Sequence, residues 1–77
     1  MTLRLISPSD VVFEGTVDSV TLPGSRGSFT VLPRLAALIS TLVKGRIVYS
    51  SNGQDHEVAT DGGLVDVLND VVSVCIY

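Results

Sequence analysis

Apolar and polar residues alternate with a period of two along most of this chain. Leu3 and Leu5 share one face of Thr2–Ile6, and the same alternation runs through Gln54–Thr60. Side chains that alternate in this way are typical of a half-buried β-strand. The pattern predicts strands over Thr2–Ile6, Ser28–Leu32, Arg46–Ser50, Gln54–Thr60, Gly63–Leu68 and Val71–Tyr77.

Two segments depart from the simple alternation. Between Val11 and Leu22 the apolar positions change from odd to even numbers near Asp18 and Ser19, which predicts a β-bulge with one extra residue. Leu35–Leu42 has apolar residues at helical spacing as well, and we interpret it as a turn that leads into a strand.

Turn-forming residues separate the strands. Glycine, proline and asparagine recur every roughly 8 to 12 residues, as in Asn52-Gly53 and Asn69-Asp70, which is the spacing of a small all-β domain. β-Branched residues make up 23 of 77 positions, and this composition favours pleated sheet over helix. We predict a single all-β domain over residues 1–77, an antiparallel β-sandwich of about 8–10 short strands.

Composition and charge exclude several classes of function. The chain has five basic and eight acidic residues, a net charge of −3, and its basic residues are scattered, so no basic stripe is available for nucleic acid. Its longest apolar stretch, Leu35–Val43, is much shorter than the about 20 residues of a membrane-spanning helix. No secretory signal is apparent, and a single cysteine favours a reducing, cytoplasmic compartment.

The candidate chemical groups are weak. His56 lies between Asp55 and Glu57, but neighbouring strand residues point to opposite faces, so these side chains do not converge on a metal. Cys75 has no basic neighbour and is interpreted as a packing residue. Gly24–Ser28 is rich in glycine but precedes a strand, so it is interpreted as a hairpin tip and not as a phosphate loop. We expect no catalytic residue, cofactor or metal.

An apolar surplus in the middle of the chain points to binding. The residues concerned are Leu22, Leu32, Leu35, Leu38, Ile39, Leu42 and Val43. A domain of this size has few interior positions, so some of these side chains lie outside. We interpret part of this set as a docking face on a larger assembly.

The ordered motifs resemble those of one known family. Leu3–Gly15, Val17–Pro33, Leu35–Tyr49 and Asp61–Tyr77 are similar to the N-terminal β-sandwich of the epsilon-subunit family of the F-type ATP synthase. The resemblance rests on Phe13-x-Gly15, Leu22-Pro23-Gly24-x-x-Gly27, Leu32-Pro33, Leu38-Ile39-x-x-Leu42-x-x-Gly45 and Gly62-Gly63-x-x-x-Val67.

The resemblance implies a non-catalytic subunit of the rotor, or central stalk. Such a subunit binds the gamma subunit and the proteolipid ring, couples ion flow to ATP synthesis, and lies peripherally at the cytoplasmic face of the bacterial inner membrane. Residues matched to family positions for gamma contact are Ser7, Leu35 and Ser40, to which apolar spacing adds Leu38 and Leu42. Ring contacts are expected at Arg26, Gly27 and Ser28.

Two departures from the family pattern qualify this expectation. The family usually reads His-Ala-Pro-Leu where this chain has Leu35-Ala36-Ala37-Leu38. Long members continue into a C-terminal helical hairpin that carries self-inhibition and, in some members, nucleotide binding, and no such sequence follows Tyr77. We therefore expect a natural short form without self-inhibition or nucleotide binding.

Other classes of function make different demands on the residues. A biotinyl or lipoyl carrier domain has a comparable size and fold and needs an exposed lysine at a hairpin tip. It would use Lys44, the only lysine, although Val43 and Gly45 are not the neighbours that such a lysine usually has. A small hydrolase or metal-binding module would depend on His56.

Overall fold

The computed structural model describes all 77 residues and consists of strands, turns and loops. The nine strands are β1 (Thr2–Ser7), β2 (Asp10–Thr16), β3 (Ser19–Gly24), β4 (Gly27–Val31), β5 (Leu38–Leu42), β6 (Gly45–Ser51), β7 (Gln54–Thr60), β8 (Gly63–Leu68) and β9 (Val71–Ile76). The all-β prediction is confirmed. The strand expected at the end of Leu35–Leu42 is present as β5, whereas Leu35–Ala37 before it is an irregular loop and the turn lies at Pro33 and Arg34. The structure holds no helix of the length and hydropathy that a membrane crossing requires.

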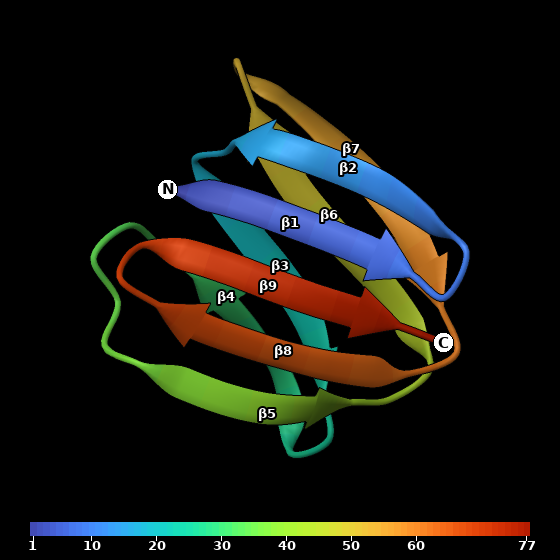
Figure 1. Ribbon diagram of the computed structural model, residues 1–77. Coiled ribbons are helices and arrows are strands. Elements are labelled where there is room, and N and C mark those ends of the chain that lie inside the picture. The colour runs from blue at the N-terminus through green and yellow to red at the C-terminus, as the bar shows by residue number, and fades with distance from the viewer.

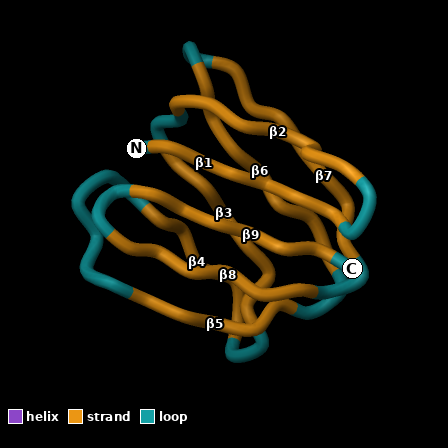
Figure 2. Tube along the Cα trace, viewed as in Figure 1, coloured by secondary structure: helices purple, strands orange, loops and turns teal.

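One curled sheet forms both layers of the sandwich. Its strand order is β2-β1-β9-β8-β5-β3-β6-β7, with β4 paired to the other edge of β3. Figure 1 shows β2, β1, β9, β8 and β5 in front, and β4, β3, β6 and β7 running across them behind. The layers are joined where β5 meets the end of β3, at the pair Leu42↔Gly24. The coil-like connections lie at the ends of the strands, as the teal segments in Figure 2 show.

The core fills the space between these layers. It contains fourteen buried hydrophobic residues, among them Leu3 and Leu5 of β1 and Val20 and Leu22 of β3. These are the positions that the sequence alternation assigned to inner faces, because a strand buries every second side chain. Burial of these apolar side chains is the main stabilising contribution in a domain of this size.

Two sequence predictions about strand pairing are wrong. The pairing is not wholly antiparallel, because β1 lies parallel to β9. The expected bulge at Asp18 and Ser19 is instead a break between strands: β2 ends at Thr16, and the chain passes to the rear layer before β3 begins. The inward-facing positions change from odd to even numbers at this crossing. The structure does contain a bulge, but it lies in β2 at Val12, opposite the Leu5/Ile6 step of β1.

Aromatic side chains close the side opposite the β3–β5 junction. Phe13 of β2 packs against Tyr49 of β6 in a tilted arrangement with ring centroids 4.4 Å apart, and Tyr49 stacks on His56 of β7 with centroids 5.1 Å apart. β2 and β7 are the two ends of the strand order, so side chains and not backbone pairing hold the layers together there. The result is one body closed on both sides.

Candidate docking surface

The β3–β4 hairpin carries the three residues predicted to contact the ring. Gly24 pairs with Gly27, so Ser25 and Arg26 form a two-residue turn, and Arg26, Gly27 and Ser28 are all exposed. Gly27 has φ +121°, a conformation that favours glycine. A Cβ added at Gly24 would lie 2.7 Å from the Gly27 carbonyl oxygen. The interpretation as an exposed hairpin tip is confirmed, and the two glycines determine its shape.

The tip is held against β5 by two hydrogen bonds. The Ser25 amide donates to the Thr41 carbonyl oxygen at 3.0 Å, and the Ser25 and Thr41 hydroxyls are hydrogen-bonded at 2.7 Å. Neither hydroxyl could be identified from the sequence, because the contact joins residues sixteen positions apart. This attachment fixes the tip relative to the front layer and reduces the conformational entropy it would lose on binding.

A hollow of about 440 Å³ lies beside this attachment. It is lined by Gly24–Gly27 of the hairpin and Leu38–Thr41 of β5. Predicted ring contacts (Arg26, Gly27) and predicted gamma contacts (Leu38, Ser40) therefore share one hollow, although two separate surfaces were expected.

Strand β5 turns its two faces to different surroundings. Leu42 is 6% exposed and belongs to the core, and Leu38 packs against that core. Ile39, between them, is 71% exposed on the outer face. The inclusion of Leu42 in a docking face is therefore corrected: its apolar spacing reflects burial, and Ile39 is the large apolar side chain that β5 presents to solvent.

The remaining predicted gamma contacts lie far apart. Leu35 is exposed in the β4–β5 loop, whereas Ser7 ends β1, where its hydroxyl donates to the Asp10 carbonyl oxygen at 3.4 Å. β9 and β8 separate β1 from β5. Leu38 of β5 lies in register with Leu3 of β1, through Val67 of β8 and Val72 of β9. Leu3 is near the start of β1, whereas Ser7 is at its end. A partner that contacts Ser7 and Leu35 together must span the front layer.

Asp70 ties the β4–β5 loop to the β8–β9 turn. Its carboxylate accepts a hydrogen bond of 2.9 Å from the Arg34 amide and lies 3.5 Å from the amino group of Met1. The Arg34 amide hydrogen bond is the largest cause of a lowered Asp70 pKa, with further contributions from the Met1 amino group and the Arg34 charge. The carboxylate thus orders the loop that holds Leu35.

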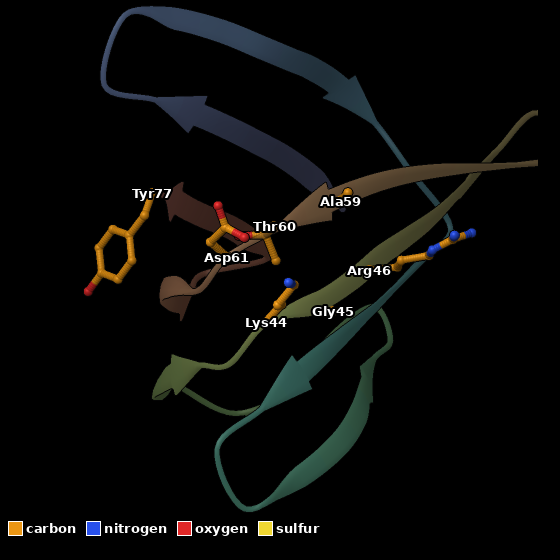
Figure 3. A pocket seen from close by; sticks show the side chains of 7 residues that line it. All are labelled: Lys44, Gly45, Arg46, Ala59, Thr60, Asp61 and Tyr77. Carbon is orange, nitrogen blue, oxygen red and sulfur yellow. The ribbon is translucent and has the colours of Figure 1, made fainter.

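Lys44 lies in a different kind of place from the lysine of a carrier domain. It is in the connection between β5 and β6, which are not paired with each other, so it is not on a hairpin tip. Figure 3 shows its side chain directed toward Thr60 and Asp61 in a hollow of about 330 Å³. The buried Thr60 hydroxyl is already satisfied by the backbone of Gly62.

His56 and Cys75, the other candidate chemical groups, are both exposed strand residues. His56 is an exposed strand residue, as predicted, and its ring stacks on Tyr49. Cys75 was expected in the packing, but it is exposed on the outer face of β9. The alternation around it explains the error, because Val74 and Ile76 take the two inward positions.

Comparison with known proteins identifies the family. Residues 1–76 match the family model described as ATP synthase, Delta/Epsilon chain, beta-sandwich domain. The chain is 47% identical over 73 residues to the ATP synthase epsilon chain of Wolinella succinogenes, covering 94% of this chain and 54% of the relative. It is 40% identical over 73 residues to that of Desulfitobacterium hafniense, covering 95% and 55%. The chain thus spans about half the length of these curated relatives.

Chains in two solved ATP synthase structures share this fold. A chain of the Euglena gracilis mitochondrial ATP synthase OSCP/F1/c-ring structure superposes with a TM-score of 0.90 at 19% identity, covering 96% of this chain and 48% of that one. A chain of the Tetrahymena thermophila central stalk/c-ring structure gives 0.81 at 16%, covering 97% and 61%. Neither the matches nor the position of Lys44 supports the biotinyl or lipoyl alternative. The match to the family model over residues 1–76 places this chain in the ATP synthase delta/epsilon chain family, as its β-sandwich domain.

Proposed function

We propose that this chain is a non-catalytic rotor element of an F-type ATP synthase and couples ion flow through the ring to ATP synthesis. It acts at the cytoplasmic face of the bacterial membrane as a peripheral component. The observation that carries the proposal is the β3–β4 tip, which is shaped by two glycines and attached to β5, beside an exposed apolar residue of the same strand. A subunit that transmits torque needs docking elements fixed to a body that deforms little.

Two surfaces follow from this arrangement. The tip, with Arg26, Gly27 and Ser28, faces the proteolipid ring and offers polar contacts. The gamma subunit is bound through Leu35 of the β4–β5 loop and the outer face of β5, where Ile39 supplies apolar area. Apolar side chains that become fully buried at the centre of an interface account for most of its binding energy.

The test is a pull-down of the tagged chain from native membranes, followed by mass spectrometry. We expect the gamma subunit and the ring protein to be recovered with it. Ile39→Asp is expected to reduce recovery of gamma, because it places a charge on the docking face, while the exposed position leaves the domain folded.

Val11→Asp is the matched control, because Val11 is 61% exposed on β2, at the opposite edge of the front layer. Recovery of neither subunit with the unsubstituted chain would refute the proposal. Equal losses with both variants would refute the assignment of β5 as the gamma-binding face.

A further inference from the structure

The tip of the β6–β7 hairpin consists of an asparagine followed by a glycine. β6 ends at Ser51 and β7 begins at Gln54, and these two residues form the last pair of the hairpin. Asn52 and Gly53 are therefore a two-residue loop, and both are exposed. Figure 1 shows this tip at the top of the molecule, and β5 with the β3–β4 hairpin at the bottom. The proposed function makes no use of the β6–β7 tip.

The Asn52 side chain and the Gly53 amide are both free. The Asn52 carboxamide takes part in none of the side-chain hydrogen bonds of the structure. The Gly53 amide donates none of the backbone hydrogen bonds of the turns and loops. A Cβ added at Gly53 would meet no atom within 4 Å, so open space surrounds this glycine. Neither group has to give up a contact before it can react.

We propose that Asn52-Gly53 is a deamidation site, at which the chain reacts with itself and then with water. The Gly53 amide nitrogen attacks Cγ of Asn52, the new N–Cγ bond closes a succinimide ring, and the Cγ–Nδ2 bond breaks. Nδ2 leaves as ammonia together with the proton of the Gly53 amide. Hydrolysis of the N–Cγ bond then gives aspartate. Hydrolysis of the bond from the nitrogen to the main-chain carbonyl carbon gives isoaspartate, whose backbone runs through Cβ and Cγ and is longer by a carbon atom.

The ring can close after a local opening of the turn. Asn52 has φ 53°, in the left-handed region that is unfavourable for residues with a side chain. Release of this conformation disturbs the neighbouring Ser51↔Gln54 pair and leaves the core in place. Ends of elements open in this way at low free energy. Because Gly53 has no side chain, nothing hinders the rotation that brings its nitrogen to Cγ.

Asn69-Asp70 is an internal comparison within the same chain. It is also a two-residue loop, between β8 and β9, with φ 50° and 65°. The residue after this asparagine is held in place, because the Asp70 carbonyl oxygen accepts from the Thr2 amide at 3.0 Å and its carboxylate accepts from the Arg34 amide at 2.9 Å. Its side chain also hinders attack by its own amide nitrogen. The structure therefore favours reaction at Asn52 over reaction at Asn69.

An isoaspartate at position 52 alters a contact between the layers. The Ser51 hydroxyl donates to the Thr16 carbonyl oxygen at 3.0 Å, and the Asp18 amide donates to the Ser50 carbonyl oxygen at 2.8 Å. These bonds join β6 to the end of β2 and to the connection that follows it, on the side where no strand pairing links the layers. An added backbone atom next to Ser51 shifts this residue and destabilises the fold. Aspartate preserves the backbone, because Asp-Gly adopts the same turn as Asn-Gly.

Incubation of the isolated chain at mildly alkaline pH, followed by peptide mass spectrometry, tests the site. We expect loss of the Asn52 amide, while the Asn69 amide is retained. An isoaspartyl methyltransferase supplied with S-adenosylmethionine detects isoaspartate, and we expect it to methylate position 52. Retention of the Asn52 amide in the folded chain, or equal loss at both asparagines, would overturn the proposal.

Two variants separate the added backbone atom from the added charge. Asn52→Asp carries the charge of the product without the extra atom, and Asn52→Gly keeps a two-residue turn but has no amide to lose. We expect incubation to lower the urea midpoint of the unsubstituted chain, whereas freshly prepared Asn52→Asp should unfold at the original midpoint and incubated Asn52→Gly should keep its own. An unchanged midpoint of the isoaspartyl chain, or an equal fall in either variant, would overturn the assigned effect of isoaspartate on the layer contact.

Discussion

One pair of substitutions on β5 tests the assignment of its two faces. Leu42→Ala and Ile39→Ala each remove three side-chain carbon atoms, but Leu42 is 6% exposed and Ile39 is 71% exposed. At about 0.8 kcal/mol per buried methylene, the Leu42 change costs about 2.4 kcal/mol in transfer free energy, and the cavity brings the loss to about 3 kcal/mol. The exposed Ile39 change is expected to cost at most about 0.5 kcal/mol.

Urea unfolding followed by circular dichroism measures both values. A chain of this size has a total stability of about 4–12 kcal/mol and a urea dependence near 1 kcal/mol per molar, so Leu42→Ala should lower the midpoint by about 3 M. Ile39→Ala should leave it within about 0.5 M of the unsubstituted chain. A larger loss from Ile39→Ala than from Leu42→Ala would refute the reasoning, because it would mean that β5 is shifted by one residue and has exchanged its faces.

Three further predictions concern the tip, the β4–β5 loop and the outer face. Gly24→Ala should destabilise the chain by about 1–3 kcal/mol in the same assay, because its Cβ meets the Gly27 carbonyl oxygen and the Phe29 ring. A loss no larger than that of Gly15→Ala, where the added Cβ meets only the end of the Phe13 side chain, would contradict the tip geometry. Because the pKa of Asp70 is lowered, its carboxylate stabilises the fold at pH values above the ordinary carboxyl pKa, and this contribution is lost as the pH falls through the pKa of the folded state. Asp70→Asn should therefore reduce the dependence of the free energy of unfolding on pH in the acid range. An unchanged pH dependence would argue against the loop contact. Cys75 should react with a maleimide in the native isolated chain as fast as in urea, and a slow native reaction would contradict its exposure.

Short-range features of the fold could be predicted from the sequence. Leu3 and Leu5, and likewise Val72 and Val74, are apolar residues at every second position, and they identify the inner faces because a strand allows only two side-chain directions. The Asn52-Gly53 and Asn69-Asp70 turns were also predictable. All four of these residues have positive φ, and each pair forms a two-residue hairpin loop.

Long-range pairing could not be predicted in the same way. The parallel pair of β1 with β9 joins the two ends of the chain, and no local pattern of either strand distinguishes it from an antiparallel pair. The hydrogen bonds of Ser25 to Thr41 likewise depend on the layer crossing. Ile39 was within reach, because once Leu35–Leu42 is assigned a strand, Leu38 and Leu42 fall on one face and Ile39 on the other.

The β3–β5 junction connects the fold to the proposed function. It is the one place where the front layer is hydrogen-bonded to the rear layer along the strand order, through Leu42↔Gly24 and the amide of Val43, which donates to the Pro23 carbonyl oxygen at 2.9 Å. The Arg26 turn and the Ile39 face both extend from this junction, so the proposed ring contact and the proposed gamma contact are connected through paired backbone and not through a flexible loop. Close packing resists a force applied at either contact because an interior of this density deforms little. A docking element that transmits torque is therefore best placed where the two layers are hydrogen-bonded to each other. Gly24 and Gly27 allow the chain to turn at this place.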